Sequence, residues 1–148
     1  LESNCYNCMF EGCTSLTSAP ELPATYLVRE CYHSMFNGCT SLASAPILPA
    51  TTLDWGCYSE MFQGCTSLTS APELPAKELI RNCYQLMFKD CSKLRYVKAL
   101  FTTGPSEETT KDWLSGVAAS GTFVKSKNAT WNVTDVHGIP KGWKIETR

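Results

Sequence analysis

The sequence predicts an α/β solenoid, in which the chain winds as stacked coils of short parallel strands and short helical turns. One ladder of cysteines repeats every 26 residues, at Cys5, Cys31, Cys57 and Cys83. A second ladder keeps the same spacing, at Cys13, Cys39, Cys65 and Cys91. Apolar rows recur between the ladders, at Tyr6, Tyr32, Tyr58 and Tyr84 and at Leu16, Leu42, Leu68 and Leu94. A unit of this kind cannot bury its apolar side alone, so the units are expected to stack.

The period and the prolines narrow the class of solenoid. A period of 26 residues lies within the leucine-rich-repeat range of about 20–29 and is too short for ankyrin, tetratricopeptide or propeller units. Two prolines in each unit, such as Pro72 and Pro75, exclude paired long helices. We therefore expect Cys57–Gln63 to form a single helical turn that ends at Gly64.

A short strand and a bend are expected after each helical turn. Leu68, Ala71 and Leu74 are the predicted inward positions of this segment. Proline cannot donate to a sheet ladder, so the sheet should stop just before the proline row, near Ala19, Ala45 and Ala71. The Pro-x-Leu-Pro segment that follows should be extended, with polyproline-like geometry. Residues 1–100 are thus predicted to form a right-handed leucine-rich-repeat-like solenoid of about four coils.

The repeat pattern is lost after Lys98, and residues 101–148 are predicted to form an α+β cap. Ser106–Val117 has a plausible N-cap, acidic residues in its first turn and one apolar face, and is therefore predicted to be an amphipathic helix. Gly121–Lys125 and Trp143–Glu146 are predicted strands. A solenoid needs its last apolar face covered, and this cap is expected to cover the fourth coil.

Composition limits the classes of partner. The net charge is −1, so no electrostatic field attracts nucleic acid or an anionic membrane. No apolar run approaches the roughly 20 residues that span a bilayer, so direct membrane insertion is not expected. Leu1 keeps the register of Leu27 and the sequence starts within a unit, which favours a fragment of a longer exported protein. A monomer is expected.

The repeat core resembles a known family. The pattern Met-Phe-x-Gly-Cys-Thr-Ser-Leu-x-Ser-Ala-Pro-x-Leu-Pro-Ala occurs at 9–24, 35–50 and 61–76. It is similar to the BspA-like leucine-rich-repeat surface proteins of anaerobic gut and oral bacteria. Their end segments resemble residues 113–117, 121–123 and 138–143. The resemblance implies a leucine-rich-repeat-like solenoid, a bacterial cell-surface location (often as a lipoprotein), adhesion or binding of host or matrix proteins, and no catalytic residues or cofactor.

The nine cysteines leave three hypotheses open. They can be buried free thiols that act as small apolar side chains. Stacked cysteines about 5 Å apart could also form disulfides, which an exported protein permits. Cys5 and Cys8 have the spacing of half a zinc site, but no second Cys-x-x-Cys accompanies them. His33 and His137 lie in different regions and in no catalytic motif, so no metal, cofactor or catalytic residue is predicted.

Candidate ligand contacts are the positions at which the units differ, because stacking does not determine them. On the strand side these are Glu21, Ile47 and Glu73, followed by Tyr96 and Lys98. Two exposed aromatics in variable rows, each of which could instead pack against a neighbouring coil, are Tyr26 and Trp55.

These positions favour a non-catalytic extracellular binding or adhesion module, whose partner would be a host or matrix protein or a glycan. The alternative is a rigid spacer that presents another domain, since the first three units are nearly identical. An enzyme is disfavoured because the sequence has no nucleophile–base pair.

Overall fold

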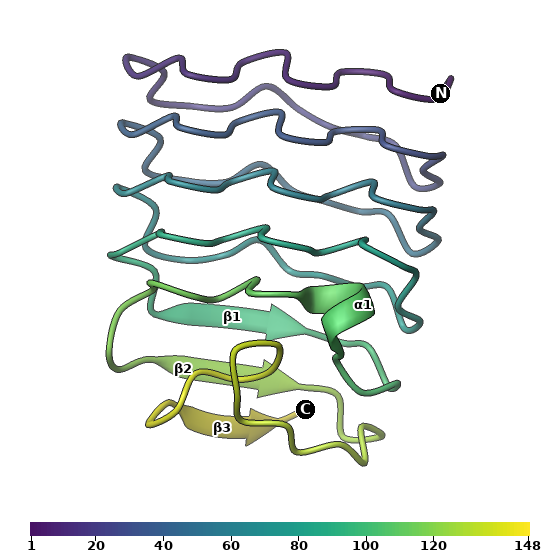
Figure 1. Cartoon of the computed structure of the whole chain (residues 1–148), viewed down its shortest axis with the longest axis vertical. Helices are drawn as coiled ribbons and strands as arrows, with labels where there is room; N and C mark the ends of the chain where they lie inside the picture. The colour runs from purple at the N-terminus through teal and green to yellow at the C-terminus, as the bar shows by residue number, and fades with distance from the viewer.

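The computed structural model describes residues 1–148, and its chain forms circuits that are stacked along the long axis (Figure 1). We call these circuits coils and number them by the 26-residue period: 1–26, 27–52, 53–78, 79–104 and 105–130. The regular elements are β1 (Tyr96–Ala99), α1 (Glu107–Thr110), β2 (Thr122–Lys125) and β3 (Lys144–Thr147). The three strands form one parallel sheet in the order β1-β2-β3. No helix has the length and apolar character needed to cross a membrane.

Backbone hydrogen bonds join each coil to the next along its series of turns, residues 3–12, 29–38, 55–64 and 81–90, which we call the turn runs. The Phe36 amide donates to the Met61 carbonyl and the Phe62 amide to the Met87 carbonyl, both at 2.9 Å. The Gly38 amide, two residues beyond Phe36, likewise donates to Gln63 at 2.8 Å. Every second amide of this run therefore points along the stack.

The predicted helical turn at Cys57–Gln63 is wrong, because this segment is a series of tight turns. The amides that do not reach the next coil bond within their own coil, as Met61 does to Tyr58 and Gln63 to Glu60. This alternation needs left-handed backbone at some positions, and Glu60 has φ +58°. Left-handed φ costs roughly 1–2 kcal/mol for a residue other than glycine. A helix would keep every amide inside the segment, whereas these turns free half of them to bind the neighbouring coil.

One row of left-handed residues marks the end of each series of turns. Its members have φ between +61° and +75° and are Gly12, Gly38, Gly64, Asp90 and Gly116. The expected break at Gly64 is thus observed, although it ends turns rather than a helix. The same row continues to Gly116, inside the segment predicted to be a cap.

The proline-containing runs pair much less regularly than the turn runs. The first and second coils are joined there only by isolated bridges, at Ser18–Ser44 and Tyr26–Thr52, and no bridge joins the second coil to the third. A regular strand begins in the fourth coil, where Lys98 replaces a proline and β1 forms. Pairing here also extends past the expected stop at Ala71, because the Leu74 amide donates to Lys98 at 2.9 Å. Missing proline amides explain why the earlier coils lack a continuous ladder.

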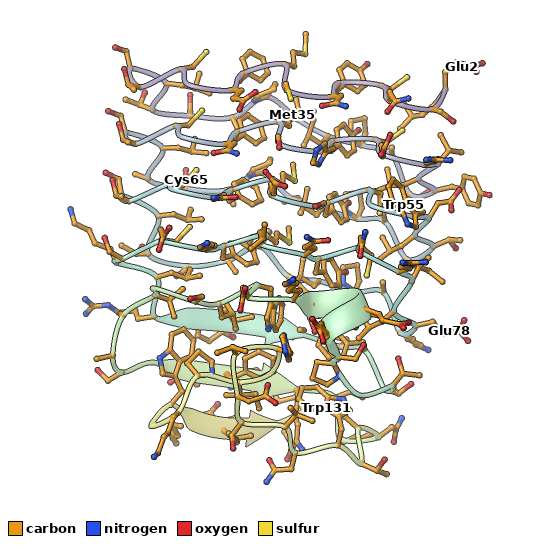
Figure 2. All side chains as sticks on the ribbon, viewed as in Figure 1. Glu2, Met35, Trp55, Cys65, Glu78 and Trp131 are labelled. Carbon is orange, nitrogen blue, oxygen red and sulfur yellow. The ribbon has the colours of Figure 1, made fainter.

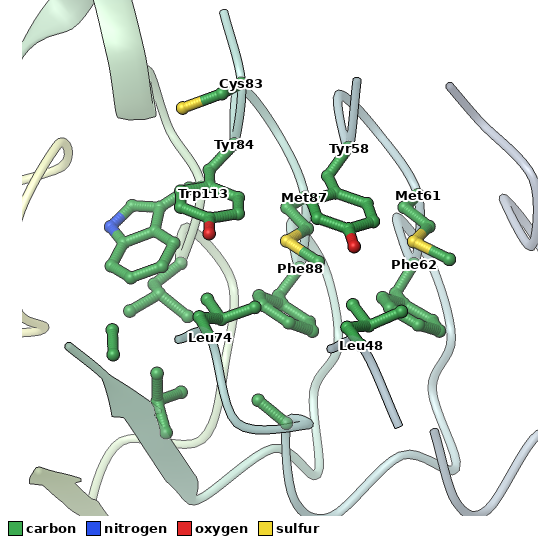
Figure 3. Packing of buried hydrophobic residues seen from close by; sticks show 14 of the residues in the cluster. Leu48, Tyr58, Met61, Phe62, Leu74, Cys83, Tyr84, Met87, Phe88 and Trp113 are labelled. Atoms are coloured by element: carbon green, nitrogen blue, oxygen red, sulfur yellow. The ribbon is translucent and has the colours of Figure 1, made fainter. Parts of the chain in front are cut away.

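The core lies between the turn run and the proline-containing run of each coil. Leu48 and Leu74 project from the proline-containing runs toward Met61 and Phe62 and their counterparts in the next coil (Figure 3). The phenylalanines of successive coils stack with ring centroids 5.5–5.6 Å apart and planes within 11° of parallel: Phe10, Phe36, Phe62 and Phe88. These periodic rows bury apolar surface on both sides of every coil–coil contact. This burial is the main contribution to the stability of the stack.

The predicted helix over Ser106–Val117 is wrong in length, since only α1 is helical and turns follow it. The reason is that the fourth coil uses the carbonyls of this segment. The Leu86 amide donates to Lys111 and the Phe88 amide to Trp113, both at 2.9 Å. Carbonyls that accept bonds from another coil are unavailable to continue a helix.

Residues 101–148 contact the fourth coil, and part of this segment keeps the 26-residue register. Tyr96 of β1 pairs with Thr122 of β2, the same offset as between units. The predicted strands Gly121–Lys125 and Trp143–Glu146 correspond to β2, which begins one residue later, and to β3, which is shifted by one residue. The domain boundary at residue 100 stays a prediction, and the stacking continues across it.

The two ends of the stack differ in how well they are covered. In the first coil Tyr6 is 45% and Met9 57% exposed, whereas the equivalent Tyr32 and Met35 are only 2% and 1% exposed. Toward the other end, Trp113 of the fifth coil is fully buried, and its indole N–H donates to the Gly138 carbonyl at 2.8 Å.

Replacing Trp113 should therefore test how much the last coils stabilise the stack. The indole packs against Tyr84, Phe101 and Phe123 at centroid distances of 5.9–6.1 Å. Trp113→Ala should lower the free energy of unfolding by about 3–5 kcal/mol, measured by urea denaturation, because it opens a cavity and removes a hydrogen bond. Trp55→Ala, at a partly exposed position, is the control and should cost much less. Equal losses would contradict this account of the core.

Candidate functional site: the proline-lined face

The structure brings Glu21, Ile47 and Glu73 together as one row on the proline-containing runs. Ile47 is 82% exposed and is the most exposed large apolar side chain of the chain. Both neighbours in its row are glutamates, so the apolar residue is specific to the second coil. We call this surface, from Ala19 to Pro75, the proline-lined face.

Two shallow grooves flank Ile47 on the proline-lined face. The first, of about 360 Å³, lies between the first and second coils and is lined by Pro20, Pro23, Pro46 and Pro49. The second, of about 460 Å³, lies between the second and third coils and is lined by Pro46, Pro49, Pro72 and Pro75. Ile47 lines both grooves and forms the ridge between them.

The grooves exist because the proline-containing runs lack backbone pairing. No backbone hydrogen bond joins residues 19–24 to residues 45–50. Proline rings offer apolar surface and no donor, so the surface of the grooves combines apolar rings with carbonyls that remain free to accept. A partner side chain that fills such a groove must be apolar or aromatic, with donors at its edge.

Charge is distributed unevenly along the row. Glu73 accepts a hydrogen bond from the Lys98 ammonium at 2.7 Å, which neutralises the end of the row nearest β1. Glu21 is exposed and forms no ion pair. A basic group on a partner would therefore meet an available carboxylate beside the first groove.

The remaining predicted contacts do not all lie on this face. Tyr96 is half-buried in β1 and pairs with Ser70, so it extends the face toward the sheet. Tyr26 is 61% exposed but lines neither groove. Trp55 belongs to the turn runs, where the Arg29 guanidinium lies 4.5 Å from the centre of its ring. The structure thus separates Trp55 from the other candidates.

Sequence reasoning missed the role of the prolines in forming grooves. It treated Pro20, Pro46 and Pro72 only as positions where the sheet stops. The signal was present in the spacing of Pro20 and Pro23 around an exposed variable residue, repeated in two further units. Two prolines at a fixed spacing in each coil place four proline rings around each groove between neighbouring coils.

The cysteine ladders have a regular environment that is unlike a reactive or metal-binding site. Six of the ladder thiols are fully buried, in the second, third and fourth coils: Cys31, Cys39, Cys57, Cys65, Cys83 and Cys91. The Cys39 thiol donates to the Phe10 carbonyl at 3.0 Å, and Cys65 and Cys91 repeat this contact one coil and two coils later. All nine cysteines are present as free thiols. The geometry fits thiols that pack as small side chains and bond to the preceding coil.

Burial also makes these thiols poor nucleophiles. Desolvation raises the pKa of the Cys57, Cys65 and Cys83 thiols to about 12 each. The pKa of the Cys91 thiol is raised further, again chiefly by burial. Because the thiolate is the reactive form, these residues are unsuited to redox catalysis near neutral pH.

The two histidines lie in different parts of the structure and have different hydrogen-bonding environments. His33 lies on the turn runs, and its Nδ1 is 3.1 Å from the Ser59 carbonyl oxygen. The Nδ1 atom of His137 is buried and has no hydrogen-bond partner. The structure contains no group of three or more His, Cys, Asp or Glu side chains arranged to hold a metal ion.

Comparison with protein-family models, with curated proteins and with solved structures finds no match for this chain. The resemblance to BspA-like proteins and the leucine-rich-repeat class of the fold therefore stay predictions that depend on the sequence motifs.

The raised thiol pKa values predict a loss of stability in alkaline solution. These groups stay protonated when folded, whereas unfolded cysteines ionise above pH 9.0, so the unfolded state binds fewer protons there. The free energy of unfolding should be insensitive to these thiols below about pH 9. It should then fall toward pH 12, by about 1.4 kcal/mol per pH unit for each thiol.

Urea denaturation of the reduced protein from pH 7 upward would measure this slope. Cys65→Ala should unfold more easily at neutral pH but show a shallower decline above pH 9, because one ionising group has been removed. A wild-type curve that stays flat to pH 11 would show that the thiols are not buried as described.

Proposed function

We propose that this chain is a leucine-rich-repeat-like solenoid that acts as a non-catalytic binding module on the surface of a bacterial cell. The resemblance to BspA-like proteins supports the cell-surface location and the adhesive role. The main structural support is Ile47, which is 82% exposed between two proline-lined grooves. Repeated units need no apolar residue there for stacking, since the equivalent residues of the first and third coils are glutamates.

The chemistry of the face favours a host or matrix protein as partner. The two grooves lie one coil apart, so they can take two neighbouring apolar or aromatic side chains with Ile47 between them. Donors on the partner would meet the free carbonyls of the proline-containing runs, and a basic side chain would pair with Glu21. An apolar centre with polar groups at its rim is the usual anatomy of a specific protein interface.

A rigid spacer is the second candidate. The close similarity of the first three units and the regular stacking of their rings favour it. The two functions differ in what they require of Ile47, because a spacer needs no apolar residue at that position.

Ile47→Glu separates these candidates and makes the second coil match its neighbours. Stability should change by less than about 0.5 kcal/mol, because the side chain is exposed. Binding should be measured by biolayer interferometry against a panel of extracellular-matrix and host-cell surface proteins. The binding hypothesis predicts at least one partner whose affinity falls tenfold or more in the variant.

A conservative control is Ile47→Val, which keeps the apolar ridge and should retain most of the affinity. If the wild-type protein binds no member of the panel, or if Ile47→Glu binds equally well, the spacer function is favoured instead.

A further inference from the structure

A separate cleft lies on the turn runs, away from the two grooves of the proline-lined face. It has a volume of about 170 Å³ and lies beside Trp55, where the second, third and fourth coils meet. Figure 2 places Trp55 toward one edge of the stack and Cys65 toward the other. The residues that matter for its chemistry are Glu30, Trp55, Gly56, Glu60, Asn82 and Gln85.

The cleft coincides with two consecutive departures from the repeat. Trp55 stands in a row where both adjacent coils carry arginine, at Arg29 and Arg81. The next residue is Gly56, in a row where the adjacent coils carry Glu30 and Asn82. Gly56 and these two neighbours have left-handed φ, between +55° and +65°, so the backbone is the same and only the side chain is missing.

Gly56 therefore opens the cleft. A Cβ atom at this position would lie 3.4 Å from Cγ of Glu30, so a longer side chain would extend over the space that the cleft occupies. The third coil thus combines a large aromatic ring with the removal of a neighbouring side chain. Stacking of the coils requires neither change, because the units on both sides lack them.

Several groups of the cleft are already held in place. The Arg29 guanidinium packs 4.5 Å from the centre of the Trp55 ring. The Ser59 carbonyl oxygen lies 3.1 Å from Nδ1 of His33, which fixes that imidazole at the edge of the cleft. The Glu60 carboxylate accepts a hydrogen bond from the Ser34 hydroxyl at 3.4 Å. Side chains that are ordered before binding lose less entropy when a ligand arrives.

We propose that this cleft binds one neutral sugar ring, as a terminal or branching residue of a glycan. Carboxylates accept hydrogen bonds, and amides both donate and accept, which matches hydroxyl groups that do both. Trp55 also lines the cleft, so the part of its indole that Arg29 does not cover supplies an apolar surface for the C–H groups of a pyranose. The volume is well below the roughly 300–1,000 Å³ of pockets for drug-sized ligands, which limits the ligand to about one ring.

A cationic side chain is the competing ligand, because Glu30 and Glu60 are negative. Arg29 already occupies the cation–π position on the Trp55 ring, and its charge repels a second cation. The uncharged amides of Asn82 and Gln85 add donors that a cation cannot use. These observations favour the neutral sugar. The inference does not depend on the proline-lined face, which uses other residues.

A two-dimensional NMR titration of the ¹⁵N-labelled full chain tests the proposal. The probes are glucose, galactose, mannose, fucose, N-acetylglucosamine and N-acetylgalactosamine, added separately, with arginine amide as the cationic probe. At least one sugar should shift the Trp55 indole N–H and the Gly56 amide signals with a saturable, millimolar dissociation constant. The proposal is overturned if no sugar shifts these signals, or if arginine amide shifts them and the sugars do not.

Two variants built from the neighbouring coils serve as matched tests. Trp55→Arg restores the residue of Arg29 and Arg81, and Gly56→Asn restores that of Asn82. Both should fold, and both should weaken sugar binding at least tenfold. Ile47→Glu should leave sugar binding unchanged, so the outcome here is separate from that for the proline-lined face. Unchanged sugar affinity in both Trp55→Arg and Gly56→Asn would also overturn the proposal.

Discussion

Hydrogen bonds between equivalent runs of successive coils are the constraint on which the rest of this structure depends. Alternate amides of each turn run bind the next coil, as Phe36 binds Met61 at 2.9 Å. Such bonds require left-handed backbone at fixed positions, and they place each phenylalanine ring over its counterpart 5.5–5.6 Å away. The buried thiols follow from the same register, since Cys65 and Cys91 each donate to a carbonyl of the preceding coil. Backbone pairing and apolar packing therefore stabilise the same contacts.

The sequence predicted the features that repeat and missed those that depend on backbone conformation. The 26-residue period identified the buried rows, because a position that is apolar in every unit must face the core. It could not distinguish a helical turn at Cys57–Gln63 from tight turns, since both place Tyr58, Met61 and Phe62 on one side. Gly116 lies in the same row as Gly64 and indicates that the stack continues past residue 100. This register was missed because the side chains around Gly116 no longer match the repeat.

The candidate sites occur where one coil carries a different side chain from its neighbours, at positions that the stacking of the coils does not determine. Ile47 was predicted from such a difference, and the structure adds the two grooves that surround it. The sequence indicated Trp55 as a candidate contact but did not predict the cleft beside it. The shape of the cleft depends on the missing side chain of Gly56 and on residues from three coils. A stack of nearly identical units is thus a regular frame on which single substitutions, such as Ile47 and Trp55, change the surface locally.

The most direct test of this account is to measure scalar couplings across the hydrogen bonds between coils. In ¹⁵N,¹³C-labelled protein, the amide nitrogen of Phe36 should couple to the carbonyl carbon of Met61, and that of Phe62 to the carbonyl carbon of Met87. These couplings would establish that alternate amides bind the neighbouring coil. Couplings from the same amides to carbonyls four residues earlier would instead show a helix, and would contradict the arrangement on which the packing, the thiols and the grooves depend.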